Sequence, residues 1–289
     1  MRLAVLFIIA YLPCIVSAQS QTARQFKDSL LSTISTDTPD TSIFSAYQKI
    51  ALAFKFTDLD STLKYTLLAE KSIEISNYPL QHATILGYKA YYAFMTGNYD
   101  ESLDLMDELL AGTEGNESLE IETIRRKTLN DQGTIYAALG MYELALSKFY
   151  NLYEMYQSEG VKNESFYVAL SNIGVMYNRL ELYEKALEIF LQLDEEMPAT
   201  YQSRMSVPVN LGFIYYDLNE FDKAKYHLNN ALAQQGVDPR VYGLSNFKLG
   251  QVYIAEGEYE RAIDVFYTSI DVFTGQNNEL ETVQSLNGL

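Results

Sequence analysis

One phrase recurs along most of this chain and constrains the fold more than any other feature. Its clearest copies read LNDQGTIYAALGMYELALSKF, LSNIGVMYNRLELYEKALEIF and PVNLGFIYYDLNEFDKAKYHL, beginning at Leu129, Leu170 and Pro208. A fixed repeat of this kind predicts a stacked array, because one unit alone leaves its apolar face in water. The recurring small residues are the glycines Gly133, Gly174, Gly212 and Gly250 and the alanines Ala145, Ala186, Ala224 and Ala262.

Each copy predicts a hairpin of two antiparallel helices. Small residues lie three or four positions from large aromatic residues, which places a hole beside a knob on one helical face. Two helices can therefore approach closely at the small residue and interlock at the ring. We expect these close contacts at Gly174 with Ala186 and at Gly212 with Ala224.

The junction between the two helices of each hairpin also has a signature. A residue in the left-handed conformation commonly ends a helix, and glycine adopts that conformation at least cost. Gly97, Gly140 and Gly257 occupy this position in three copies, whereas Glu181 and Asn219 occupy it in two others.

The copy that begins at Leu170 contains Ile173-Gly174, Tyr177, Tyr183, Ala186, Phe190 and Pro198. The residue types and the spacing of this set resemble those of the tetratricopeptide repeat, and the resemblance covers about residues 42–276. It implies an all-α, right-handed superhelical solenoid of antiparallel helical hairpins. The four alanines are 41, 38 and 38 residues apart, where the standard repeat has about 34, so the closer likeness is to the longer-repeat variants.

The pattern divides the chain into four segments. Residues 1–18 form a signal peptide, 19–42 a lead-in helix and linker, 43–276 an array of about six repeats, and 277–289 the start of a further, truncated repeat helix. The first repeat is degenerate, as expected of a terminal unit. Asp60-Ser61 is expected to cap its second helix.

The N-terminus has the features of an export signal. Arg2 precedes an apolar run, and the small residues before Gln19 suit cleavage after Ala18, which predicts a periplasmic mature protein. An uncleaved anchor is the alternative, but the run is short for the ~20 residues that span a membrane and contains Pro13. A lipoprotein anchored through Cys14 is less favoured, because Pro13 replaces the small residue wanted before a lipidated cysteine.

Charge and cysteine content narrow the partners further. The net charge of −17 becomes −18 when Arg2 is removed with the signal, which disfavours nucleic acids and anionic lipid surfaces. Cys14 is the only cysteine, so the mature protein forms no disulfide. No second apolar segment suggests an integral membrane helix after cleavage.

The sequence contains none of the common catalytic signatures. It lacks a Gly-x-Ser-x-Gly elbow, a phosphate-binding loop, a Gly-x-Gly-x-x-Gly fingerprint and a His-Glu-x-x-His motif. His82 and His227 have no partner at metal-ligand spacing, and His227 is interpreted as a surface or packing imidazole. We therefore expect no enzyme, no cofactor and no metal site.

The resemblance implies that the first helices of successive repeats line a concave groove. Counting from each repeat glycine predicts eight partner-binding residues there: Asn172, Val175, Asn178, Asn210, Phe213, Tyr216, Phe247 and Gln251. Two alternatives stay open. Neighbouring repeats could close over Phe213 and Phe247, and Asn172 and Asn210 could serve repeat-to-repeat contacts in place of binding a peptide backbone.

Two functional hypotheses follow. The first is a non-catalytic scaffold that binds a protein or peptide in the groove of the array. The second is the N-terminal sensory region of a truncated signal-transduction protein, a histidine kinase or a transcriptional regulator, because the chain resembles exported sensor regions of Bacteroidetes-type signalling proteins. The Lys and Asn pattern with which the family's chaperone-binding members hold a terminal carboxylate is missing. A lectin-like or nutrient-binding scaffold lacks supporting residues.

Overall fold

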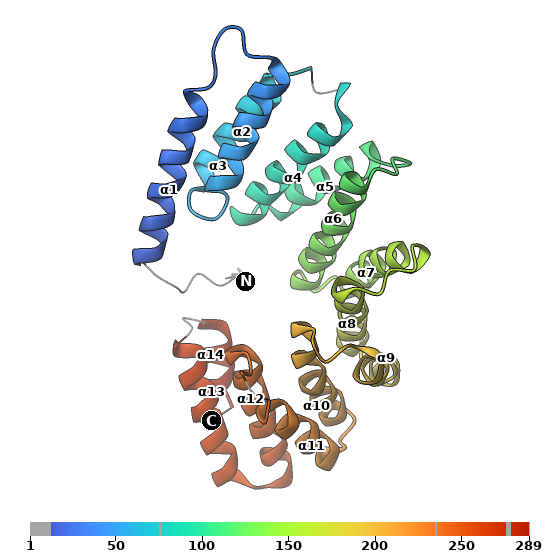
Figure 1. Cartoon of the computed structure of the whole chain (residues 1–289). Helices are drawn as coiled ribbons and strands as arrows, with labels where there is room; N and C mark the ends of the chain where they lie inside the picture. The colour runs from blue at the N-terminus through green and yellow to red at the C-terminus, as the bar shows by residue number, and fades with distance from the viewer. Residues whose placement is uncertain (1–12, 75–76, 235, 276–278, 289) are drawn as a thin grey trace. The chain divides into compact units, whose positions relative to one another are not determined.

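The structure, a computed structural model, describes residues 13–74, 77–234, 236–275 and 279–288, and within these ranges it contains helices and no strand (Figure 1). Consecutive helices pack as hairpins, which confirms the predicted all-α, tetratricopeptide-like array. The chain divides into two compact units whose boundary, between Ile135 and Tyr136, lies inside one helix. We call them the N-terminal unit and the C-terminal unit.

The N-terminal unit begins with a helix that packs on the first hairpin. Its elements are α1 (Pro13–Leu31), α2 (Asp40–Phe54), α3 (Leu59–Lys71), α4 (Pro79–Met95), α5 (Tyr99–Gly112) and most of α6 (Leu119–Ala138). Ala23 of α1 joins a buried cluster with Ile50, Phe54 and Tyr65 of α2 and α3. Figure 1 shows α2 beside α3 and α4 beside α5, and these are the two hairpins of the unit.

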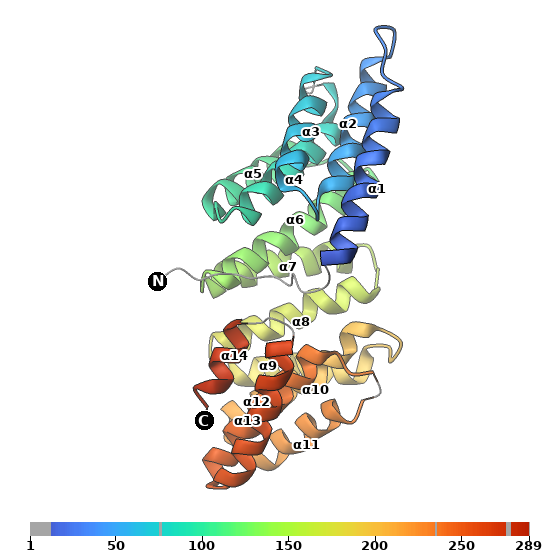
Figure 2. The same cartoon turned by 90° about the vertical axis from the view of Figure 1, so that its left-hand side faces the viewer.

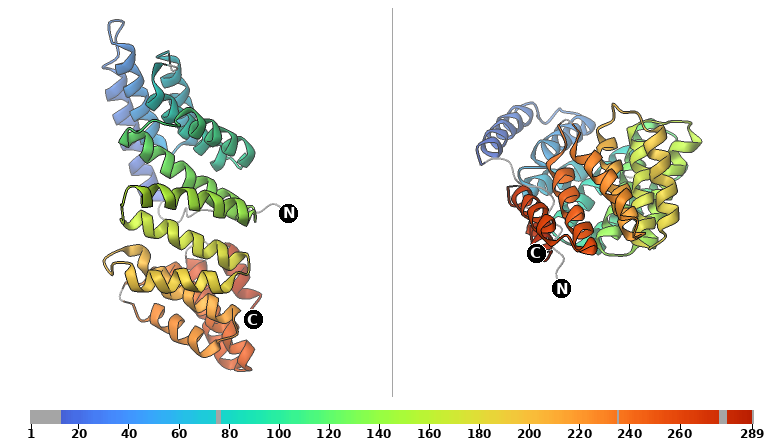
Figure 3. Two further views of the ribbon diagram at one scale, coloured as in Figure 1. Left: turned by 90° about the vertical axis from the view of Figure 1, so that its right-hand side faces the viewer. Right: turned by 90° about the horizontal axis from the view of Figure 1, so that it is seen from below.

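The C-terminal unit contains the clearest copies of the repeat. After the end of α6 its elements are α7 (Tyr142–Ser158), α8 (Glu164–Arg179), α9 (Tyr183–Glu196), the 3-10 helix η2 (Gln202–Ser206), α10 (Val207–Asp217), α11 (Phe221–Leu232), α12 (Pro239–Glu256), α13 (Tyr259–Gly275) and α14 (Glu279–Leu286). Figure 2 shows α12 beside α13. The left view of Figure 3 shows α7, α8 and α9, coloured yellow-green to yellow, as successive layers.

Glycine sets the helix spacing in these hairpins, as predicted. A Cβ atom added to Gly174 would lie 2.7 Å from the Phe190 ring, and one added to Gly212 would lie 2.5 Å from Leu228 Cγ. Both distances are shorter than any real Cβ contact, so the partner side chain occupies the place of the missing methyl group. Ala186 and Ala224, on the second helices of these two hairpins, are completely buried.

The predicted turn positions are also confirmed. Gly97, Gly140 and Gly257 have positive φ angles of 81°, 76° and 79°, and Glu181 and Asn219 both have a φ of 59°. The left-handed conformation is therefore imposed by the hairpin geometry even where the residue is not glycine.

One capping prediction is wrong. The N-cap of α3 is Asp58, which has extended backbone angles, rather than Asp60-Ser61. The backbone N–H of Ser61 donates to Asp58 Oδ1 at 2.9 Å, and the Ser61 hydroxyl donates to Oδ2 at 2.7 Å. Ser61 is thus the residue that pairs with the cap. These two hydrogen bonds hold the pKa of Asp58 below its usual value.

Residues 1–12 lie outside the described part of the chain, and α1 runs through Ala18 without interruption. Within the described ranges, no helix combines the length and the apolar character needed to cross a membrane. Signal cleavage after Ala18 stays a prediction.

Candidate functional site

The eight predicted groove residues lie on three first helices of the C-terminal unit. Helix α8 carries Asn172, Val175 and Asn178, helix α10 carries Asn210, Phe213 and Tyr216, and helix α12 carries Phe247 and Gln251. Helix α10 contacts both α8 and α12. The structure therefore brings the eight residues onto neighbouring helices, and we call this set the first-helix strip.

Two amides of the strip have an oxygen without a partner. Asn178 Nδ2, on α8, donates to Asp217 Oδ2, on α10, at 3.3 Å. Asn178 Oδ1 is buried and accepts no hydrogen bond from any residue that the structure describes. Gln251 Oε1 on α12 is likewise buried and unpaired, as is Gln132 Oε1 in the N-terminal unit. Buried polar atoms without a partner are rare in folded proteins, and each calls for an explanation.

The two asparagines predicted to contact a peptide backbone are already engaged. Asn210 Nδ2 donates to the carbonyl oxygen of Ser206 at 2.9 Å, one turn earlier in the chain. Asn172 is half-buried on α8 and also takes part in an interaction within the protein. Binding of a peptide backbone by these two residues stays a prediction. Asn210 would have to accept through its side-chain Oδ1 atom or break its hydrogen bond to Ser206.

Phe247, which was predicted as a groove residue, takes part in the packing of its own hairpin. Its ring meets the Phe266 ring of α13 edge-on, with centroids 5.8 Å apart. Phe266 fills the hole at Gly250, where an added Cβ would lie 2.6 Å from the ring, and Phe247 extends that contact. Val175 is similarly used by the fold, because it packs against a buried cluster that contains Ile173 and Met176.

Phe213 and Tyr216 face a lysine from the next repeat. Lys248 Nζ lies 4.5 Å from the Phe213 ring centroid and 4.3 Å from that of Tyr216, and Tyr216 also meets Phe221 at 5.9 Å. The next repeat therefore covers these rings in part. This outcome agrees, for Phe213, with the alternative that a neighbouring repeat closes over the ring. The covering group is a cation rather than an apolar side chain.

Lys248 was not among the predicted groove residues, although its position in the repeat could have indicated it. It lies two residues before Gly250, as Asn172 and Asn210 lie two residues before Gly174 and Gly212. Only 9 % of its surface is exposed. Burial is the main cause that lowers its pKa, and the positive charge of Arg179 lowers it further, whereas Asp217 acts in the opposite direction.

The histidines have no shared site. His227 stacks on Tyr215 with ring centroids 5.3 Å apart, and burial lowers its pKa, so it is the packing imidazole that was expected. The Nε2 atom of His82 lies 3.8 Å from Glu108 Oε1. Among the described residues, no group of three His, Cys, Asp or Glu side chains is arranged to hold a metal ion.

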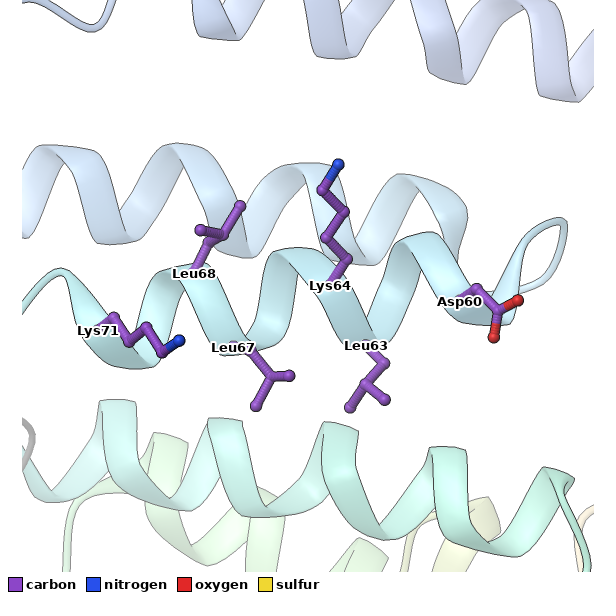
Figure 4. Close-up of a pocket in the computed structure, with 6 residues that line it drawn as sticks. All are labelled: Asp60, Leu63, Lys64, Leu67, Leu68 and Lys71. Atoms are coloured by element: carbon purple, nitrogen blue, oxygen red, sulfur yellow. The ribbon is translucent and has the colours of Figure 1, made fainter.

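A shallow hollow of about 370 Å³ runs along α3 in the N-terminal unit. Figure 4 shows Leu63 and Leu67 pointing to one side of the helix and Lys64 and Leu68 to the other, with Asp60 and Lys71 toward its two ends. All of its lining residues come from this single helix. It offers an apolar surface without convergent polar groups and is a weaker candidate than the first-helix strip.

Part of the C-terminal unit matches a known repeat family. The tetratricopeptide repeat family model matches residues 210–274, which include the α10, α11, α12 and α13 hairpins. Residues 210–274 therefore carry the tetratricopeptide repeat pattern. A further match is to the BBSome complex member BBS4 of Bos taurus, with 29% identity over 104 residues. That match covers 36% of this chain and 18% of the bovine protein, so the chain spans less than a fifth of that relative's length.

Several solved structures share the fold. The apo quorum sensor NprR from B. thuringiensis has a TM-score of 0.70 at 17% identity and is matched over 94% of this chain and 77% of its own. A tetratricopeptide repeat protein from Parabacteroides merdae has a TM-score of 0.59 at 16% identity, over 94% and 99%. The Rap conjugation regulator of plasmid pLS20, solved with the Phr* peptide, has a TM-score of 0.63 at 12% identity, over 93% and 78%.

Proposed function

We propose that this protein is a non-catalytic scaffold that binds a protein or peptide segment on the first-helix strip of its C-terminal unit. The observation that carries the proposal is the pair of buried, unpaired oxygens, Asn178 Oδ1 and Gln251 Oε1. They belong to α8 and α12, on either side of α10. Backbone N–H groups of an extended peptide are donors of the kind that such acceptors lack.

The solved relatives support this class of ligand. The pLS20 Rap regulator is described in complex with the Phr* peptide, and NprR in complex with its cognate peptide NprX. The NprR complex has a TM-score of 0.63 to this chain at 17% identity, over 94% of this chain and 80% of its own. We carry peptide binding over to this chain as part of the proposal.

A display selection tests the proposal. The purified chain is immobilised and challenged with a library of short random peptides, and enriched sequences are synthesised for calorimetry. Replacing Asn178 and Gln251 with alanine removes two acceptors, and each lost hydrogen bond of about 1 kcal/mol weakens binding about fivefold. Gln192→Ala is the matched control, because Gln192 lies on the second helix α9 and donates to Glu196 on the same helix.

Two results would count against the proposal. If no peptide is enriched over an empty support, the scaffold does not bind peptides of this kind. If the double variant and Gln192→Ala bind an enriched peptide as tightly as the wild type, binding takes place elsewhere on the chain.

The second candidate function is sensory input to a signalling protein. The description of NprR as a quorum sensor favours it, since the same fold there serves a regulator. A sensor would change its behaviour when the peptide binds, so the test is a difference in oligomeric state or protease resistance between free and peptide-bound protein. A pure scaffold would show the same oligomeric state and cleavage pattern in both states.

We also propose that the protein is exported to the periplasm after cleavage between Ala18 and Gln19. The apolar start of the sequence and the small residues before Gln19 support this proposal. N-terminal sequencing of the protein from a periplasmic extract should begin at Gln19. Retention of Met1 in a membrane fraction would exclude cleavage.

A further inference from the structure

The Lys248 ammonium is held in the first-helix strip without an anionic partner. Among the described residues it makes no ion pair and no hydrogen bond, and its Nζ atom lies over the faces of Phe213 and Tyr216. By contrast, Lys223 lies over the Tyr215 ring at 5.1 Å but also pairs with Glu220. A buried ammonium is normally paired, because its desolvation is costly.

Two rings compensate for only part of this cost. Cation–π contacts stabilise a desolvated lysine, but aromatic rings offer no hydrogen-bond acceptor to its three N–H donors, which stay available to a ligand. Asp217 lies near enough to influence Lys248 electrostatically but does not form an ion pair with it. Arg179 adds a second positive charge, so the three groups together carry one net positive charge.

We propose that Lys248 binds a carboxylate of the peptide ligand, in a cradle formed by Phe213 and Tyr216. The proposal rests on the proposed function and specifies its ligand as an acidic peptide. Lys248 is one helical turn before Gln251 on α12 and faces α10, and Asn178 is bonded to Asp217 at the end of α10. A peptide whose backbone reaches the two unpaired oxygens therefore passes beside the ammonium.

The overall charge of the chain makes this preference testable. With a net charge of −17, the protein repels acidic peptides and attracts basic ones non-specifically. Enrichment of acidic peptides in a random library can therefore come only from a local cation. The test uses the display library described above, with the wild-type full chain and with Lys248→Gln, Lys248→Met and Lys223→Gln as separate targets.

We expect Asp or Glu to be enriched at one position for the wild type and for Lys223→Gln, but not for Lys248→Gln or Lys248→Met. In a synthetic enriched peptide, the change from Asp to Asn should weaken binding to the wild type by about tenfold or more, because a charge-assisted hydrogen bond is lost. The same change should have no effect on binding to Lys248→Met. Peptides with a free or an amidated C-terminus distinguish a side-chain carboxylate from a terminal one.

Circular dichroism of each variant verifies the fold, and the Asp-to-Asn comparison on the wild type stands even if a Lys248 variant does not fold. Enriched peptides that bind equally well with Asp or Asn would overturn the assignment of Lys248 and leave the proposed function intact. Equal losses for Lys223→Gln and Lys248→Gln would also overturn it. Failure to enrich any peptide would remove both proposals together.

Discussion

The two units close their hairpins by different means. In the C-terminal unit the first helix has a glycine, and the partner side chain Phe190, Leu228 or Phe266 occupies the place of the absent methyl group. In the α4–α5 hairpin, Ala90 takes the place of that glycine and Ser102 that of the alanine. The Ser102 hydroxyl donates to the Ala90 carbonyl oxygen at 2.9 Å. The same hairpin geometry therefore does not require the same residues.

The two units also differ in how deeply a lysine is buried against aromatic rings. In the C-terminal unit, Lys248 is buried over Phe213 and Tyr216 and forms no ion pair with any described residue. In the N-terminal unit, Lys55 lies 4.5 Å from the Tyr91 ring, and burial lowers its pKa as well, but it remains half-buried rather than buried. A similar lysine and ring arrangement is thus desolvated much more deeply in the unit that we propose binds a ligand.

The largest expected effect compares two glycines. Gly212→Ala should destabilise the C-terminal unit by about 1–3 kcal/mol, because its Cβ would overlap Leu228. Gly87→Ala in the N-terminal unit would place a Cβ 3.8 Å from Leu109 Cδ1, an ordinary contact. It should be neutral or stabilise α4 by about 0.5–1 kcal/mol. Urea unfolding of the full chain measures both, and equal midpoint shifts would break the comparison.

Overpacking of the alanine contact should have an effect of similar size. Ala186 is completely buried between α8 and α9. Ala186→Leu should therefore cost about 1–3 kcal/mol, since the added atoms have no space at the interlocked face. Thermal unfolding followed by circular dichroism is the measurement. An unchanged midpoint would show that this contact is not close.

Loss of the α3 cap should be smaller. Asp58→Ala removes the acceptor for Ser61 and should cost about 1 kcal/mol at neutral pH, whereas Asp60→Ala, on the same turn, should cost less. Because the folded-state pKa of Asp58 is lowered, its contribution is present above the unfolded-state pKa of about 3.9 and is lost as the pH falls through the folded-state value.

Urea titrations of the wild type and both variants at neutral and acidic pH measure this contribution. The difference between the wild type and Asp58→Ala should shrink below about pH 4. A difference that stays constant over this range would mean that the carboxylate does not cap the helix.

The smallest effect should come from the polar contact that distinguishes the α4–α5 hairpin. Ser102→Ala restores the residue found in the other hairpins and removes one hydrogen bond, so it should cost about 0.5–1 kcal/mol. Urea unfolding again provides the value. A loss as large as that of Gly212→Ala would mean that the hydroxyl, rather than helix packing, holds this hairpin together.

The hairpins could be predicted from the sequence because their contacts are local and repeat in register. Gly174, Gly212 and the positive-φ residues Glu181 and Asn219 follow from steric requirements that recur in every copy. The α3 cap was misplaced because several polar residues follow one another there, and only the backbone angles show that Asp58 is the extended residue.

The binding strip was harder to predict, because it depends on contacts between repeats. Phe247 was predicted from its spacing as a groove residue, but its contact with Phe266 depends on how α12 crosses α13. Lys248 follows the same count from glycine as Asn172 and Asn210, yet nothing in one sequence indicates that it is buried between Phe213 and Tyr216. The order of the helices could be predicted, whereas the partner of each side chain could not.

Hydrogen exchange of the full chain, with and without a saturating acidic peptide from the display selection, tests the central claim most directly. Ligand binding lowers local opening, so amides of the contacted helices should exchange more slowly. Our account predicts new protection in α8, α10 and α12, and a peptide with Asn in place of its Asp should need about a tenfold higher concentration to give the same protection. Protection confined to α2–α5, or the same concentration dependence for both peptides, would contradict it.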